Sequence, residues 1–133
     1  MKKRNGLKTA LTIVVVALFV TSCSKDDDNT SPADSRNVKY EITGNATGTF
    51  DATYITASGS GANETPASLP WSKEIVVQSS VTAVSFNAAV IGATPGKTIT
   101  AKIFVGGVVK KEQTATVQSN GTAIIAALTY TLK

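Results

Sequence analysis

The sequence contains no histidine and a single cysteine, Cys23, among its 133 residues. These two absences exclude Ser-His-Asp triads, intrachain disulfides and zinc sites built from histidine and cysteine. The nucleotide-binding signatures, a P-loop and a GxGxxG turn, are missing as well. The commonest enzyme and metal-site classes therefore find no support.

An excess of charge of one sign is also missing from most of the chain. The formal charge of +4 comes from 13 basic and 9 acidic residues, and four of the basic residues lie in the first eight positions. From Cys23 onward the nine remaining basic residues balance the nine acidic ones. The high pI therefore does not indicate nucleic-acid binding.

The first 22 residues read as an export signal. A basic start is followed by a 12-residue apolar run, residues 9–20. A membrane-spanning helix needs about 20 apolar residues, so this run has the length of a secretory signal core. It ends in VTSC, residues 20–23, which resembles the bacterial lipobox. That resemblance implies cleavage before Cys23 and lipid on its thiol; an ordinary signal peptide with an incidental cysteine is the alternative.

Residues 23–36 read as a polar linker. Its first part contains a short acidic cluster of five residues: Ser24, Lys25, Asp26, Asp27 and Asp28. The simplest interpretation is a solvated spacer, but the cluster also resembles the export signal of surface-exposed lipoproteins in the Bacteroidetes. We therefore predict an outer-membrane lipoprotein exposed at the cell surface, with a periplasm-facing orientation as the alternative.

Residues 37–133 have the pattern of an all-β domain. Apolar and polar residues alternate over short runs separated by Gly, Pro and Asn, and no stretch shows the period of an amphipathic helix. We expect seven strands: 38–42, 49–57, 71–77, 81–91, 97–105, one between 107 and 120, and 122–132. Two facing sheets would bury their large side chains, namely Tyr40, Phe50, Trp71, Phe86, Ile103 and Ile124.

Two glycine-containing turns give information on strand pairing. Asn120-Gly121 is typical of a type I′ hairpin, and its register would place Val117 opposite Ile124 and Ala115 opposite Ala126. Gly106-Gly107 is also a hairpin candidate. A two-residue loop there would place Lys102 opposite Lys111, an unfavourable pair, so the register of this second hairpin stays open.

Three segments carry a family resemblance. Residues 38–44 (VKYEITG), 69–72 (LPWS) and 102–107 (KIFVGG) occur in the order of three motifs, V-x-Y-E-(V/I)-x-G, L-P-W-S and (K/R)-I-x-V-(N/D)-G. In these motifs the chain resembles the mycobacterial MmpS proteins and the Bacteroidetes lipoproteins similar to them. The resemblance covers roughly residues 38–132 and implies an immunoglobulin-like β-sandwich outside the cytoplasmic membrane, serving as a non-enzymatic accessory of RND-type exporters.

The chain departs from the family in two places. Family members carry a transmembrane helix before the domain, where this chain has a predicted lipid anchor. They often carry a cysteine pair late in the domain, where this chain has Ala101 and, by position, Ala126. An alanine pair can pack where a disulfide lies, so the fold inference holds, whereas an outer-membrane anchor would separate the domain from an inner-membrane pump.

The remaining candidate groups favour binding over catalysis. Glu41, Asp51 and Glu74 lie at polar positions of their strands, so we expect them to face solvent rather than to form a paired-carboxylate site.

The aromatic residues Trp71, Tyr40, Tyr54 and Tyr130 are read as core, with a sugar-stacking platform as the alternative. Five lysines are read as a solvated face, with anionic polymer or lipid headgroups as the alternative: Lys73, Lys97, Lys102, Lys110 and Lys111. The polar segment 58–68 is expected to be a loop, and Asn63, Glu64 and Thr65 are its candidate contact residues.

Together these patterns predict a lipid-anchored envelope protein without enzymatic activity, cofactor, metal or nucleic-acid partner. Its partners would be the membrane, through Cys23, and an envelope protein, which the resemblance identifies as an RND-type exporter. A surface module that binds glycan or a host ligand is the alternative function. The sequence does not fix the oligomeric state.

Overall fold

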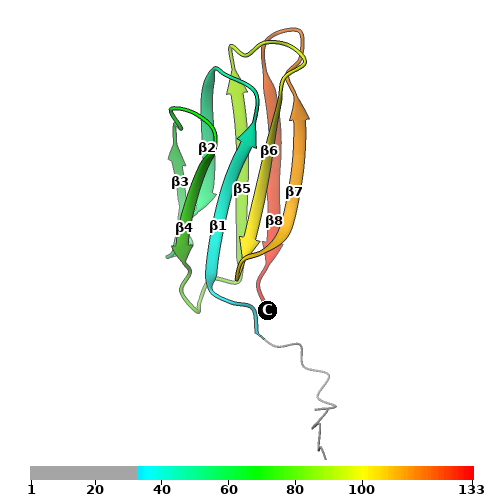
Figure 1. Ribbon diagram of the computed structural model, residues 1–133. Coiled ribbons are helices and arrows are strands. Elements are labelled where there is room, and N and C mark those ends of the chain that lie inside the picture. Colours follow the sequence, from blue (N-terminus) through cyan, green and yellow to red (C-terminus); the bar gives the residue numbers. More distant parts are fainter. Residues whose placement is uncertain (1–32) are drawn as a thin grey trace, which may run out of the picture.

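The computed structural model describes residues 33–133, which form two facing antiparallel sheets of four strands each (Figure 1). The predicted signal peptide, Cys23 and the acidic cluster at 24–28 lie outside the described residues. Among residues 33–133 there is no α-helix, and hence no helix that could cross a membrane. The prediction of an all-β domain with two sheets is confirmed.

The first sheet has the strand order β4-β1-β6-β7 and the second the order β3-β2-β5-β8. The strands are β1 (Asn37–Gly44), β2 (Thr49–Ile55), β3 (Gly61–Glu64), β4 (Trp71–Val76), β5 (Ala83–Ile91), β6 (Thr98–Val105), β7 (Val108–Thr116) and β8 (Ala123–Thr131). Only β2-β3 and β6-β7 are neighbours both in the chain and in a sheet. The other connections cross from one sheet to the other.

Alternation of side chains explains the core. In β1, β5 and β6 the buried positions recur every second residue, because successive side chains of a strand point to opposite faces. Tyr40, Phe86 and Ile103 are each fully buried between the sheets, as their strand positions predicted. Trp71 is half-buried at the start of β4 and packs against this core.

The strand count differs from the sequence prediction. Residues 61–64, which we expected within a polar loop, form β3 and pair with β2, with Asn63 opposite Thr53. The prediction of seven strands was therefore wrong by one strand. A four-residue segment without apolar alternation carries no strand signal of its own, and it is the free edge of β2 that makes it a strand.

The Gly106-Gly107 turn does form a two-residue hairpin, with Val105 opposite Val108. Both glycines have positive φ, 59° and 81°, as a type I′ turn requires. The register then shifts between Ile103 and Phe104. This β-bulge leaves Lys110 without an opposite residue and places Glu112, rather than Lys111, across from Lys102. The like-charge pair that made this hairpin doubtful is thereby avoided.

The prediction for Asn120-Gly121 was wrong. The strands on either side of it, β7 and β8, belong to different sheets, so Val117 and Ala115 do not pair with Ile124 and Ala126. Gly121 has a φ of 81°, but no residue other than glycine has positive φ among the described residues, Asn120 included. The turn is thus not type I′, and it carries the chain from one sheet to the other.

The inward face of β8 also differs from the prediction. Ile124 is 66% exposed, whereas Ile125 is fully buried. A second register shift, between Phe86 and Ala88, inserts an extra residue in β8, so that Leu128 and Ile125 both face the core. Ala126 is exposed while Ala101 is buried, so an alanine pair packed in place of a disulfide is not what the core contains.

Candidate interaction surfaces

The predicted contact residues lie at the open side of the sandwich formed by β3 and β4. Asn63 and Glu64 belong to β3 and Thr65 follows it. The Asn63 side-chain amide donates hydrogen bonds to Asp51 Oδ1 at 2.7 Å and to Thr53 Oγ1 at 2.9 Å. This polar cluster lies on the outer face of the second sheet and fixes the short edge strand to β2.

Glu64 connects the two sheets at the same side. Its Oε2 accepts a hydrogen bond from the Tyr54 hydroxyl at 2.6 Å and lies 3.6 Å from Lys73 Nζ on β4. Burial, and then the hydrogen bond to Glu64 and its charge, raise the pKa of Tyr54 to about 12. An inward-pointing lysine on an edge strand, here Lys73 on β4, also discourages pairing with another chain. The polar side chains at this side therefore protect the two edge strands from adding a further strand.

Three of the four aromatic residues that we read as core, Tyr40, Tyr54 and Trp71, cluster with Phe86 and do not form an exposed platform. The Tyr40 ring centroid lies 5.2 Å from that of Tyr54 and 5.1 Å from that of Phe86, and Trp71 stacks on Phe86 at 6.1 Å. The Tyr40 hydroxyl donates to the Ile55 carbonyl oxygen at 2.8 Å, and burial raises the pKa of this hydroxyl. One face of the Trp71 ring is thus covered by Phe86, and a stacked sugar would need an uncovered face.

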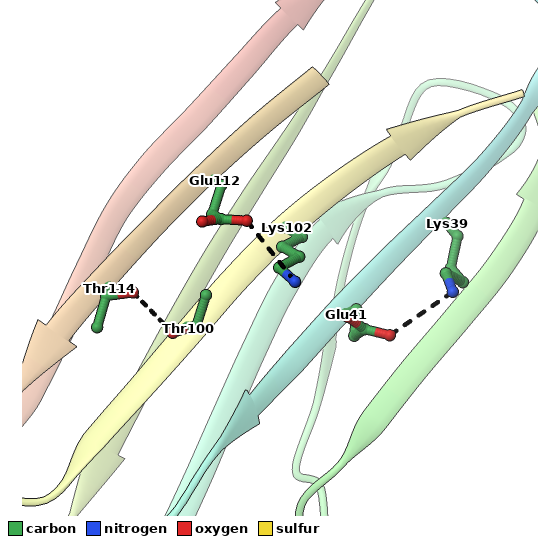
Figure 2. A network of polar contacts seen from close by, with 6 residues as sticks. All are labelled: Lys39, Glu41, Thr100, Lys102, Glu112 and Thr114. Carbon is green, nitrogen blue, oxygen red and sulfur yellow. Dashed lines mark hydrogen bonds and ion pairs between the residues drawn. The ribbon is translucent and has the colours of Figure 1, made fainter. Parts of the chain in front are cut away.

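The outer face of the first sheet carries rows of side chains across the strands (Figure 2). In one row the Thr100 and Thr114 hydroxyls are hydrogen-bonded at 2.7 Å. The next row alternates in charge, because Glu41 lies opposite Lys102 and Lys102 lies opposite Glu112, with a Lys102–Glu112 ion pair at 3.6 Å. Paired, solvated charges of this kind contribute little to stability and keep the face hydrophilic.

The character of this face changes toward the lower end in Figure 1, where β1 begins and the β6–β7 hairpin turns. There the row runs Glu74, Lys39, Phe104, Val109 across four strands. The Lys39 ammonium lies 4.2 Å from the centroid of the Phe104 ring and 3.6 Å from Glu41. Glu74, Lys39 and Phe104 line an open hollow of about 510 Å³, together with Val76 and Gly107.

The described chain enters the domain at this lower end, through residues that we had assigned to the linker. Asp34 accepts hydrogen bonds at Oδ2 from the Tyr130 hydroxyl at 3.0 Å and from the Lys133 backbone N–H at 2.9 Å. The Lys133 hydrogen bond is the main reason that the pKa of Asp34 is lowered, and burial followed by the Asp34 contact raises the pKa of Tyr130. Arg36 donates to the Val81 carbonyl at 2.7 Å. No sequence pattern predicted these tertiary contacts.

Groups that could carry chemistry are not gathered anywhere in the described part of the chain. Glu41 and Asp51 lie on the outer faces of opposite sheets, and Glu64 is engaged by Tyr54 and Lys73. No group of three or more acidic, histidine or cysteine side chains that could hold a metal occurs within residues 33–133. The described residues instead form three surfaces that could contact a partner. These are the polar side at β3–β4, the charged outer face of the first sheet, and the end with the β6–β7 hairpin, which has apolar and basic side chains.

Comparison with known proteins gives one result that bears on these surfaces. No curated protein matches the chain. The model of one family, described as Mycobacterium membrane protein, matches residues 8–130, which include the apolar run, the linker and nearly the whole sandwich. The match confirms the resemblance found in the three motifs, and the chain belongs to this family of membrane proteins, the MmpS family.

Proposed function

We propose that this protein is a lipid-anchored accessory protein of the cell envelope, which performs no chemistry and acts by contacting an envelope transport complex. The observation that carries the proposal is the family match over residues 8–130. The sandwich supports it, because its buried face is apolar and its described acidic side chains are dispersed or paired. An RND-type exporter is the partner that membership of the family suggests.

The attachment proposed is a signal peptide at residues 1–22 and a lipid on Cys23. Two or more acyl chains hold a protein durably on a membrane, at about 0.8 kcal/mol per buried CH₂. Cells fed an alkynyl fatty acid should label the wild-type chain and the Ser24→Ala control, but not Cys23→Ala. Equal labelling of Cys23→Ala would overturn the lipid anchor.

We further infer that the protein resides in the outer membrane and faces the cell surface, through the acidic cluster at 24–28. Replacement of Asp26, Asp27 and Asp28 by alanine should protect the domain from protease added to intact cells, while the wild type is cleaved. Replacement of Thr47 and Ser119, two exposed residues of the domain, is the control. Cleavage of the triple variant at the wild-type rate would show that the cluster is only a spacer.

The β3–β4 side, with Asn63, Glu64 and Thr65, is the contact surface that we propose for the transport complex. A photo-crosslinking amino acid at Asn63 should capture a transporter polypeptide identified by mass spectrometry. The same probe at Gln113, an exposed residue of the opposite edge strand β7, is the control. Capture at Gln113 alone would place the contact surface on β7 instead. If neither position captured an envelope protein, the accessory role would be overturned.

The immunoglobulin-like relationship implied by the resemblance is a finer part of this proposal. The strand arrangement differs from that of constant-type immunoglobulin domains, which place their first two strands in one sheet, whereas β1 and β2 lie in opposite sheets here.

The alternative function, a glycan- or host-ligand-binding module, is less well supported because Trp71 packs against Phe86 and Tyr54. Reproducible glycan-array binding that is lost in a folded Trp71→Ala variant would revive it.

A further inference from the structure

One end of the sandwich combines exposed apolar side chains with a concentration of positive charge. We call it the tether end and define it as residues 33–39, 55–61, 74–83, 104–111 and 130–133. Val76, Val108 and Val109 are 64%, 57% and 43% exposed there. The other two large exposed hydrophobic residues of the described chain, Ile91 and Ile124, lie at the opposite end. Exposed apolar groups alone therefore do not distinguish the two ends.

Charge does distinguish them. The tether end has five basic residues, Arg36, Lys39, Lys110, Lys111 and Lys133, against two acidic ones, Asp34 and Glu74. The rest of the described domain has three basic residues and four acidic ones. Lysine stems can lie along apolar surface while their ammonium groups stay in water. The tip sequence of two glycines, two valines and two lysines, residues 106–111, thus presents an apolar edge bordered by cations.

The path of the chain also points to this end. Asp34 is fixed by Tyr130 and by the backbone of Lys133. Next to it, a Cβ added to Gly106 would lie 2.8 Å from Ser35 Cβ, and the Gly106 N–H donates to the Asn37 carbonyl at 2.8 Å. The hairpin tip therefore lies directly beside the point where the linker leaves the domain. From Cys23 to Asp34 the linker spans at most about 40 Å, which keeps this end at high effective concentration at an attached membrane.

We propose that the tether end docks on an anionic lipid surface, with Val108 and Val109 at the acyl boundary and Lys110 and Lys111 among the headgroups. The inference rests on the membrane attachment proposed above and adds an orientation to it. The sandwich stands with its β6–β7 hairpin on the bilayer and its Asn120-Gly121 end away from it. The β3–β4 side remains free for a partner.

The test places an environment-sensitive NBD fluorophore on Val108→Cys and, as a matched control, on the exposed Ile124→Cys at the opposite end. The full chain, purified from membranes, is reconstituted in vesicles of phosphatidylethanolamine with phosphatidylglycerol. Emission at position 108 should shift to the blue and be quenched by lipids that carry a nitroxide on the acyl chain. Emission at position 124 should stay as in water.

Charge reversal tests the electrostatic part. Lys110→Glu with Lys111→Glu should lower the docked-to-free ratio at position 108 about tenfold or more, whereas Lys97→Glu at the far end should leave it unchanged. Similar emission at both probe positions would overturn the proposal. So would blue-shifted emission at 108 that is as strong in phosphatidylcholine vesicles, or that depends on protein density, since the latter indicates a second copy as the occupant.

The same labelling separates this inference from the anchor. Wild-type chain that takes up the thiol probe has a free Cys23, which contradicts the lipid anchor. The signal at position 108, taken as the difference from that of the wild type, still decides docking. If the wild-type chain stays unlabelled and the probe at position 108 stays in water, the lipid anchor is unaffected. That outcome overturns the docking alone.

Discussion

Two short connections in the second half of the chain have glycine at their centres, and they connect strands in different ways. Gly106-Gly107 joins β6 and β7 within one sheet, whereas Asn120-Gly121 leads from β7 in the first sheet to β8 in the second. At the first turn both central residues have positive φ, and at the second only Gly121 does. A pair of adjacent strands needs the twist of a type I′ turn, but a change of sheet does not.

The comparison teaches how local and tertiary preferences combine. The Gly106-Gly107 hairpin has the backbone conformation that its two glycines favour. A bulge at Lys110 then shifts the register so that Lys102 lies opposite Glu112 rather than Lys111. At Asn120-Gly121 the backbone is held by other contacts: Gly121 N–H donates to the Gln118 carbonyl, and Ala93 N–H donates to the Gly121 carbonyl at 3.0 Å. This turn is therefore shaped by the neighbouring loop of the sandwich.

The largest expected effect tests the strand that follows the second turn. Ile125→Ala removes a fully buried side chain and should lower the free energy of unfolding by about 2–5 kcal/mol. Ile124→Ala, at the exposed neighbour, should change it by no more than about 0.5 kcal/mol. Urea unfolding of both variants gives the comparison. The reverse order would restore the hairpin register predicted from the sequence.

The next effect compares glycines in the two turns. Gly107 and Gly121 both have a φ of 81°, but a Cβ at Gly107 meets nothing within 4 Å, whereas one at Gly121 lies 3.2 Å from the Ala93 carbonyl oxygen. Gly107→Ala should cost about 1 kcal/mol of unfolding free energy through backbone strain, and Gly121→Ala about 2 kcal/mol or more. Thermal unfolding measures the difference. Equal losses would mean that the Ala93 contact relaxes freely.

A smaller effect concerns the asparagine of the second turn. Asn120 Oδ1 accepts a hydrogen bond from the Thr122 N–H at 3.0 Å, a role that either Asn or Asp can fill. Asn120→Ala should destabilise the domain by about 0.5–1 kcal/mol, and Asn120→Asp should be nearly neutral. If Asn120→Gly proved stabilising, a positive φ would be wanted at this position after all.

The smallest effect tests the bulge of the first hairpin. A double-mutant cycle with Lys102→Gln and Glu112→Gln should give a coupling of about 0.2–1 kcal/mol, since both side chains are partly exposed. The coupling should disappear in 1 M salt. A cycle between Lys102 and Lys111 is the control and should show none. Repulsion between Lys102 and Lys111 would mean that the hairpin lacks its bulge in solution.

Much of the fold could be predicted because it follows from local pattern. The inward faces of β1, β5 and β6 follow from alternation, and the start of β4 follows from Pro70, which cannot donate to a ladder. The prediction failed at β3 and β8. β3 has only one small apolar residue, Ala62, and β8 has two adjacent isoleucines, of which alternation alone cannot choose the buried one.

The candidate surfaces were less predictable than the fold. Asn63 and Glu64 were singled out as loop residues, but their partners Asp51 and Tyr54 come from β2 and Lys73 comes from β4. The tether end combines residues from five separate segments of the chain. Its net charge could not be read from a sequence in which basic and acidic residues balance from Cys23 onward.

The sequence by itself determined that the domain is all-β, which side chains face inward in most strands, and where the Gly106-Gly107 hairpin turns. These properties depend on alternation and turn chemistry, which act over a few residues. Only the tertiary structure decided which sheet each strand joins, where the two bulges lie and which charges meet. Those outcomes depend on which strand edges are open and on how side chains from both sheets fill one core, and neither is a local property of the chain.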